Sequence, residues 1–329
     1  MKNVRLEDIA KRLNITKVSV SKALRNHKDI SIKTRKKVKE LAKEMGYHPN
    51  LQARSLASKK TLTIGVIVPK IAHTFFANAI EGIYEAAEES GYKVILGVSH
   101  EKEKLERENI ESMVNSRVDG LVVSVTEQTK SPDSFKIVKD MGINLVFFDR
   151  GFQNAGFSYI KVDDYGSAKT GVQHLIDNKF KNIAHIAGYS STQIGRERKR
   201  GFLDAMTENG LNVQNSSIFE GGFSEMDGYH GFKSIMENSG MPDAVFAVTY
   251  PVGLGILNYL TDYGIDTKKV TILSFGGSEF NSYLETPFIC IDQPNFDLGK
   301  LAFEQLFSEM NNQKKQEPKI IELQANVKV

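Results

Sequence analysis

The feature that most constrains the fold is a regular alternation of short apolar runs with amphipathic stretches, which starts at Thr61 and continues toward the C-terminus. A first series of apolar runs comprises TLTIGVIVP, YKVILGV, DGLVVSV and INLVFFDR, and a second extends from YIKVDDY through KNIAHIAG and DAVFAVT to FICIDQP. Apolar strands bounded by Gly or Pro and separated by helices are typical of parallel sheets with helices on both faces. Two such series predict an α/β core of two lobes, each a doubly wound parallel sheet.

The first fifty residues follow a different pattern, in which apolar residues recur at helical spacing over three short segments. We expect helices over 6–13, 17–24 and 32–45, with Asn14 ending the first and Gly46 following the third. Two short helices joined by a tight turn form a helix-turn-helix, so the sequence predicts a small all-α headpiece. Its second helix is expected to expose Lys17, Val18, Ser21 and Lys22, and its third to bury Ile32, Val38, Leu41, Ala42 and Met45.

Charge is divided unevenly between these two parts. Residues 1–60 hold 17 Lys and Arg against 5 Asp and Glu, a net charge of +12, whereas the remainder holds 26 against 35, a net charge of −9. A basic module of this kind concentrates polyanions around one end of the chain, as expected for a contact with nucleic acid.

The segment LEDIAKRLNITKVSVSKALRN, followed by DISIKTRKKVKELAKEMGYHPNLQARSLASKKTLTIGVIVP, resembles the N-terminal signature of LacI/GalR-type transcription regulators. The resemblance implies a DNA-binding headpiece over 1–49, a hinge helix and linker over 50–60, and a periplasmic-binding-protein-like core over 61–329 that binds an effector and dimerises. Lobe 1 would comprise about 61–160 and 292–318, and lobe 2 about 161–291 and 319–329.

That division of the core implies three crossings between the lobes, near Ile160, Ile291 and Pro318. A final helix over Asn295–Met310 would return to lobe 1, and a last strand over 319–324 would lie in lobe 2.

The resemblance also implies which headpiece residues contact double-stranded operator DNA. Lys17, Val18 and Lys22 would meet base edges in the major groove, because lysine donates to guanine and valine packs on a thymine methyl group. The phosphate contacts would come from Thr16, Ser19, Ser21, Asn26, Ser31, Thr34, Tyr47 and Asn50. For Thr16 and Ser31, capping of a helix is an equal alternative.

The hinge would contribute Ala53, Arg54 and Leu56 at the minor groove. Leu56 would wedge between base pairs and kink the duplex, Ala53 would allow two hinges to approach closely, and Arg54 would reach a phosphate or the groove edge. The alternative is a plain linker in which Leu56 packs on the core.

Ligands of doubly wound sheets bind at the carboxyl ends of the strands, here in the cleft between the lobes. His73, Phe75 and Phe76 follow the first strand, and Arg198 matches a position where the family commonly grips a ligand. Core packing is an equal alternative for the two phenylalanines, and the aspartates at strand ends are alternatively helix caps or bridges between lobes. The expected effector-binding residues are His73, Phe75, Phe76, Asp149, Asp163, Arg198, Tyr250 and Gln293.

Two positions depart from the family pattern. Thr249 and Tyr250 stand where an Asn-Asp pair is common, and Gly276 and Gly277 stand where aspartates are common. Carboxylates that accept hydrogen bonds from vicinal hydroxyls are therefore missing from two usual places. A carbohydrate-related small molecule is the expected effector, although a larger glycan fragment, a more apolar ligand and a protein partner remain open.

Other classes of protein find little support. The sequence has no GxGxxG after a strand, no P-loop, no HExxH and no GxSxG, so we expect no enzyme, no cofactor and no metal. Cys290 is the only cysteine, which excludes an internal disulfide. No apolar run is long enough to cross a membrane and no secretion signal is evident, so a transport solute-binding protein is disfavoured and a cytoplasmic location is expected.

The family resemblance implies a homodimer that reads a near-palindromic operator and represses carbohydrate-utilisation genes.

Overall fold

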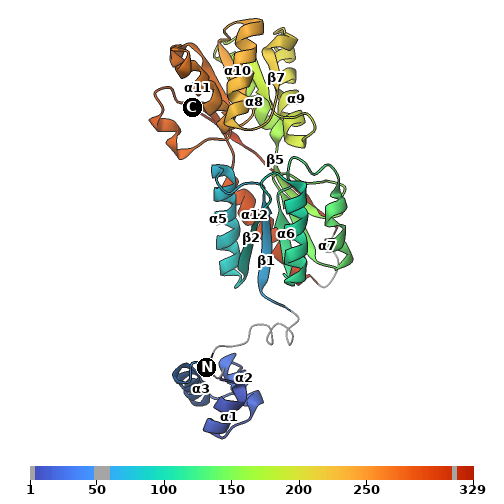
Figure 1. The fold of residues 1–329 in the computed structure, drawn as a ribbon, viewed down its shortest axis with the longest axis vertical. Helices are drawn as coiled ribbons and strands as arrows, with labels where there is room; N and C mark the ends of the chain where they lie inside the picture. The colour runs from blue at the N-terminus through green and yellow to red at the C-terminus, as the bar shows by residue number, and fades with distance from the viewer. Residues whose placement is uncertain (1–3, 48–59, 313–316) are drawn as a thin grey trace. The chain divides into compact units, whose positions relative to one another are not determined.

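A computed structural model describes residues 4–47, 60–312 and 317–329. The chain divides into two compact units, Met1–Thr61 and Leu62–Val329, and each is considered by itself. Figure 1 shows the smaller all-helical unit and the larger unit with its two α/β lobes.

The headpiece consists of α1 (Leu6–Leu13), α2 (Lys17–Leu24) and α3 (Ile32–Glu44). Asn14 ends α1 in the left-handed conformation, with φ of 50°, and the turn leads directly into α2. The three helices enclose a small core of Ile9, Ala10, Val20, Ala23, Val38, Leu41 and Ala42.

One headpiece prediction is wrong. Ile32 was expected on the apolar side of the third helix, yet its side chain is 77% exposed. Ile32 is the first residue of α3, and the buried face of this helix begins only at Val38. The helical period assigns a face to each residue, but it does not show that the helix end extends beyond the core.

Lobe 1 is built on a six-stranded parallel sheet in the order β11-β5-β4-β3-β1-β2. Its strands are β1 (Thr63–Val68), β2 (Lys93–Val98), β3 (Gly120–Val123), β4 (Asn144–Phe148), β5 (Ser158–Val162) and β11 (Ile320–Leu323). One face packs on α5 (Thr74–Glu89) and α12 (Asn295–Asn311), and the other on α6 (Glu103–Asn115) and α7 (Lys136–Asp140), which follows the 3-10 turn η1 (Pro132–Phe135). Helix α12 lies beside α5 although more than 200 residues separate them (Figure 1).

Lobe 2 has a second six-stranded sheet in the order β12-β10-β9-β8-β6-β7. Its strands are β6 (Ile183–Ala187), β7 (Ile218–Glu220), β8 (Ala244–Ala247), β9 (Thr271–Phe275), β10 (Ile289–Asp292) and β12 (Asn326–Lys328), of which β12 alone runs antiparallel to its neighbour. Helices α8 (Asp164–Asp177) and α9 (Gln193–Glu208) cover one face, and α10 (Glu225–Ser239) and α11 (Tyr250–Asp262) cover the other. Short 3-10 turns lie at η2 (Asn215–Ser217), η3 (Thr267–Lys269) and η4 (Glu279–Tyr283).

The last crossing between lobes differs from the expectation. The strand expected in lobe 2 over 319–324 is β11, which pairs in parallel with β5 in the sheet of lobe 1. Without β11, β5 would be an edge strand with unpaired backbone groups. The N–H of Tyr159 donates to the Lys319 carbonyl at 2.8 Å, and the N–H of Asp163 donates to the Leu323 carbonyl at 2.9 Å. The chain therefore crosses at 324–325 rather than near Pro318, and only β12 joins lobe 2.

Glycine sets the close approach of α5 to α12. A Cβ atom added at Gly299 would overlap the backbone carbonyl oxygen of Ala79, and one added at Gly82 would overlap that of Phe296. Lobe 1 thereby holds the N-terminal ends of both helices beside the cleft.

We expect Gly299→Ala to lower the free energy of unfolding of the core by about 1–3 kcal/mol, because α5 and α12 must separate to admit the methyl group. Chemical denaturation of the full-length chain measures the change. The matched control is Ser308→Ala, at an exposed position of the same helix. Equal stability of the Gly299 variant and the control would contradict this account of the packing.

Candidate functional site

The first candidate site is the outer face of α2, where the base-contacting residues are expected. Lys17 and Val18 are exposed, Val18 to 62%, and Lys22 is half-buried. Each lysine contacts a carboxylate: Lys17 Nζ lies 2.5 Å from Glu7 Oε1, and Lys22 Nζ lies 2.5 Å from Asp29 Oδ2. These hydrogen bonds lower the pKa of the Glu7 and Asp29 carboxyls. Both pairs are open to solvent, so each contributes little to stability and the lysines can exchange partners at little cost.

The expected phosphate-contacting side chains flank this face. Thr16 and Ser31 cap α2 and α3, since their hydroxyls accept from the N–H groups of Ser19 and Thr34. Each capping hydroxyl also shares a hydrogen bond with a second hydroxyl, Thr16 with Ser19 at 2.9 Å and Ser31 with Thr34 at 2.8 Å. Ser21 Oγ accepts from Arg25, Asn26 adopts a left-handed φ of 58°, and Tyr47 packs at the edge of the headpiece core. The remaining expected contacts, Asn50, Ala53, Arg54 and Leu56, lie outside the described residues.

The second candidate site is a cavity of about 240 Å³ between the two lobes of the core. It lies where β4, β9 and β10 end and where α5, α11 and α12 begin, with α9 closing one side. The structure brings together at this cavity seven of the residues expected there, namely His73, Phe75, Phe76, Asp149, Arg198, Tyr250 and Gln293.

Asp163 is not among the residues that line this cavity. Its carboxylate caps α8, accepting from the N–H of Gly166 at 2.9 Å, and Gln324 Nε2 lies 3.5 Å from its other oxygen. The local N-cap geometry turns the carboxylate toward its own helix, so the structure favours the capping alternative for this residue.

Arg198 is the most constrained side chain of the cavity. It is 3% exposed; its Nε donates to Asp164 Oδ1 at 2.8 Å, and its Nη2 lies 2.7 Å from the same oxygen. Nη1 donates to the Val248 carbonyl at 2.7 Å, and the guanidinium carbon lies 3.5 Å from the ring centroid of Phe275. Burial raises the pKa of Asp164, while Arg198 opposes that rise.

Asp149 supplies a buried carboxyl at the end of β4. Its backbone adopts φ of 59°, which Asp tolerates better than most residues, and its carbonyl oxygen accepts from the Tyr159 hydroxyl at 2.7 Å. Ser124 Oγ donates to the carboxylate at 3.1 Å. Burial raises the pKa of Asp149 to about 6, in spite of the nearby positive charge of Arg150.

Sequence reasoning missed Arg150. Its Nη1 lies 3.0 and 3.2 Å from the two carboxylate oxygens of Glu101, and its guanidinium lies 5.5 Å from the ring centroid of Phe223, which belongs to lobe 2. Arg150 therefore joins the lobes beside the cavity. The signal was present in the strand end INLVFFDR, where the residue after Asp149 also reaches the cleft.

The other residues missed are mostly apolar. Phe223, Ile194, Leu254 and Phe275 line the cavity together with the expected aromatic residues. Burial also lowers the pKa of His73 to about 4, so this imidazole is neutral at physiological pH. The cavity thus offers aromatic faces, with polar groups at few positions.

Within the part of the chain that the structure describes, no group of three or more His, Cys, Asp or Glu residues could hold a metal ion. Among the same residues, no helix is both long enough and apolar enough to span a bilayer.

Comparison with known proteins matches both units to family models. Residues 5–50 match the model of bacterial regulatory proteins of the lacI family, and residues 64–314 match a periplasmic binding protein domain. The chain belongs to the LacI family. Members of this family are DNA-binding transcription regulators rather than enzymes, and this chain is therefore a DNA-binding transcription regulator.

LacI-family relatives align along nearly the whole chain. The chain is 29% identical over 313 residues to catabolite control protein A of Priestia megaterium, covering 94% of each. Identity to the protein of the same name from Staphylococcus xylosus is 25% over 322 residues, covering 97% of this chain and 96% of the relative.

Solved structures of transcription regulators share the fold. The lac repressor dimer bound to operator and the anti-inducer ONPF has a TM-score of 0.86 at 21% identity, covering 99% of this chain and 98% of that one. The complex of the transcriptional regulator CelR with cellobiose has a TM-score of 0.74 at 24% identity, covering 99% of both chains.

The raised pKa of Asp149 makes core stability depend on pH. The folded state holds the Asp149 proton more tightly than the unfolded state does. Protonation of Asp149 therefore stabilises the folded core; this contribution is complete below about pH 4 and is lost as the pH rises through 6. A shift of about two pKa units corresponds to roughly 3 kcal/mol.

We expect Asp149→Asn to remove the loss of stability at high pH, because asparagine does not ionise. The free energy of unfolding of the variant should exceed that of the wild-type chain at pH 8 and lie closer to it at pH 4. Denaturant titrations across this pH range measure both values. Asp140→Asn, at an exposed position, controls for net charge. Parallel pH profiles for the wild-type chain and the Asp149 variant would show that this carboxyl does not carry the effect.

Proposed function

We propose that this regulator binds a near-palindromic operator as a homodimer and represses carbohydrate-utilisation genes in the cytoplasm. A small effector in the cleft between the core lobes would control the binding. The observation that carries the proposal is the exposed face of α2, which presents Lys17, Val18 and Lys22 on a segment with a net charge of +12.

At the operator, Lys17 and Lys22 exchange their carboxylate partners for acceptors on base edges. Guanine O6 and N7 are suited to each ammonium group, and Val18 packs against a thymine methyl group. The hydroxyls at the N-termini of α2 and α3 contact phosphates and fix the register of the headpiece without reading sequence. Two headpieces in a symmetric dimer then read two half-sites on one face of the duplex.

The hinge over 50–60 lies almost wholly outside the described residues, and its role is proposed from the family resemblance. Ala53 lets two hinge helices approach each other, Arg54 reaches a phosphate or the groove edge, and Leu56 enters the minor groove. Leu56 is then the residue that bends the operator.

The effector acts through the angle between the lobes. Contacts among the described residues bridge the lobes beside the cavity: Lys130 Nζ donates to Ser191 Oγ at 3.1 Å, and Arg150 lies against Phe223. A ligand that binds the core more tightly at one lobe angle than at another shifts the population of molecules toward that angle. The separation of the two hinges, and hence their joint fit to the minor groove, changes with that population.

We expect Lys22→Ala to lower the preference for operator over random duplex by about 5- to 150-fold, the equivalent of 1–3 kcal/mol for one base contact. Fluorescence anisotropy with both duplexes at one salt concentration gives the ratio. Lys43→Ala, in the last turn of α3, removes the same charge from an exposed position and is expected to weaken both affinities alike. Equal ratios for the two variants would remove Lys22 from the base-reading set.

Leu56→Ala is expected to abolish most of the operator bend, because alanine is too short to separate stacked base pairs. Circular-permutation gel shifts measure the bend angle, and Gln52→Ala provides a hinge control. A full bend with Leu56→Ala would favour the plain-linker alternative for this segment.

A further inference from the structure

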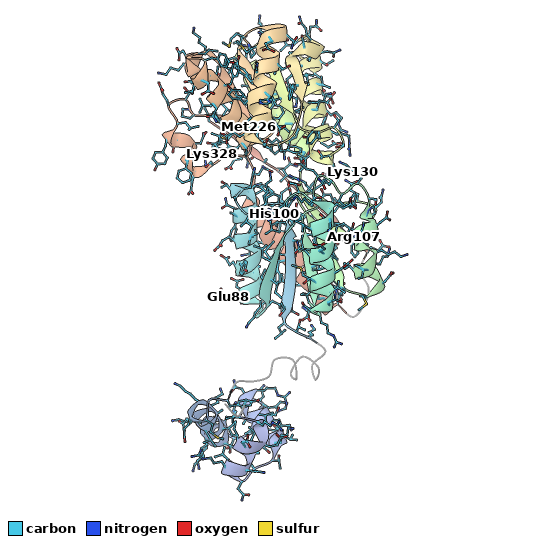
Figure 2. The ribbon with its side chains drawn as sticks, viewed as in Figure 1. Glu88, His100, Arg107, Lys130, Met226 and Lys328 are labelled. Atoms are coloured by element: carbon cyan, nitrogen blue, oxygen red, sulfur yellow. The ribbon has the colours of Figure 1, made fainter. Side chains whose placement is uncertain are left out.

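A carboxylate lies beside the base-contacting lysine near the end of α2. Asp29 Oδ2 is 2.5 Å from Lys22 Nζ, and the Asp29 side chain is 47% exposed. Side chains cover the outside of the headpiece (Figure 2), and the charged ones are mostly basic, with five acidic residues in 1–60. Because DNA is a dense polyanion, a carboxylate on the face that approaches it weakens binding unless it makes a favourable contact there.

The turn between α2 and α3 holds this carboxylate in place. The N–H of His27 donates to the Lys22 carbonyl at 3.0 Å, so the chain folds back on the last turn of α2. From α3, Arg35 donates through Nη1 to the Asn26 carbonyl at 3.2 Å and braces the same turn. Asp29 therefore belongs to a backbone segment that is fixed against the helix that carries Lys22.

A histidine contacts the other oxygen of the carboxylate. His27 Nδ1 lies 2.7 Å from Asp29 Oδ1, whereas Lys22 contacts Oδ2. The hydrogen bond from Lys22, and then that from His27, lower the pKa of the Asp29 carboxyl. The group is thus ionised at neutral pH and acts only as an acceptor. When Lys22 turns to a base edge, His27 and the turn keep the carboxylate at the same place, and Oδ2 needs another donor.

Glu7, which contacts the other base-contacting lysine, is held less firmly. Its Oε1 lies 2.5 Å from Lys17 Nζ, but it comes from α1 on a longer side chain. Within the part of the chain that the structure describes, no second side chain hydrogen-bonds to its carboxylate. Glu7 can therefore rotate away when Lys17 reaches DNA, whereas Asp29 stays beside Lys22.

The contact with Lys22 sets which base edges Asp29 would face. Successive base pairs are about 3.4 Å apart, so a group this close to the ammonium faces the same base pair or an adjacent one. In a G·C pair the major groove presents guanine N7 and O6 as acceptors, with the cytosine N4 amino group as a donor beside them. A carboxylate accepts from cytosine N4 or adenine N6 and is repelled by the keto oxygens of guanine and thymine.

We propose that Asp29 is a base-reading residue that acts together with Lys22. With the lysine on guanine, the carboxylate accepts a hydrogen bond from an exocyclic amino group, cytosine N4 or adenine N6, in that base pair or the next. Keto oxygens at the same place are rejected. This inference rests on the proposed operator binding and adds to it a specificity-determining residue outside α2.

The test is selection from a randomised duplex pool at one salt concentration, with the full-length wild-type chain and its variants in parallel. Lys22→Ala identifies the base pair that the lysine reads, because preference is relaxed there. We expect Asp29→Ala and Asp29→Asn to relax the preference at that base pair or an adjacent one and nowhere else. Alanine removes the acceptor, and asparagine, which keeps the shape, also donates and so tolerates keto oxygens.

Glu44→Gln is the matched control. Glu44 pairs with Arg12 at 3.2 Å, both side chains are exposed, and the pair joins the last turns of α3 and α1 without involving α2. This variant removes the same charge from the headpiece as Asp29→Asn does. We expect it to raise affinity for all duplexes alike and to leave every base preference unchanged.

Duplexes that differ only at the assigned position give the magnitude. Fluorescence anisotropy is expected to show about fivefold or more tighter binding of the wild-type chain to the amino-bearing base than to a keto base, as for one mismatched base pair. For either Asp29 variant the same ratio should fall below about twofold. Circular dichroism verifies that each variant is folded.

The outcomes separate this inference from the proposed function. Unchanged base preferences in both Asp29 variants, with affinities raised alike as in Glu44→Gln, would overturn the inference and leave the regulator intact, since Asp29 would then only compete with DNA for Lys22. A change at a position not adjacent to that of Lys22, or the same change in Glu44→Gln, would also overturn it. Failure of the wild-type chain to enrich any sequence would overturn the proposed function and this inference with it.

Discussion

The cleft of the core depends on the buried guanidinium of Arg198. This side chain joins α9 to the start of α8 through Asp164, to the end of β8 through the Val248 carbonyl, and to β9 through the ring of Phe275. A charge that is 3% exposed is tolerated only when its donors are satisfied, and removing one partner of such a pair typically costs about 3–5 kcal/mol. The carboxyl ends of the lobe 2 strands are thus held in one arrangement, which fixes one wall of the cavity before any ligand binds.

Lobe 1 meets this fixed wall with a more adjustable one. Arg150 reaches Phe223 across the cleft, and Lys130 reaches Ser191, yet each contact is a single interaction that a change in interlobe angle can break. Because Glu101 holds the Arg150 guanidinium within lobe 1, opening the cleft does not leave an unpaired charge. A rigid wall opposite a movable one allows a small ligand to change the lobe angle without disturbing the core of either lobe.

Sequence was sufficient where function depends on local pattern. The helical spacing predicted α2 with Lys17 and Lys22 on its outer face, and the order of strands and helices predicted the two-lobed α/β core. Residues that follow strands, such as His73 and Gln293, lie at the cavity because parallel strands end at one edge of a sheet.

The wrong predictions arise where two hydrogen-bonding partners compete for one group. Asp163 follows a strand as Asp149 does, but its carboxylate accepts from the N-terminus of the helix that follows it rather than facing the cavity. Strand β11 could not be assigned to a lobe because its pairing with β5 joins segments about 160 residues apart, and sequence spacing does not reveal such pairing.

The central claim is that the basic headpiece makes the chain a sequence-specific regulator of DNA, with the cleft as its control site. The most direct measurement is selection from a randomised duplex pool at physiological salt, comparing the full-length protein with a chain that begins at Thr61, followed by sequencing of the retained duplexes. We expect the full-length protein alone to enrich a near-palindromic sequence. Failure of the full-length protein to enrich any sequence, or equal enrichment by the chain that lacks the headpiece, would contradict the claim.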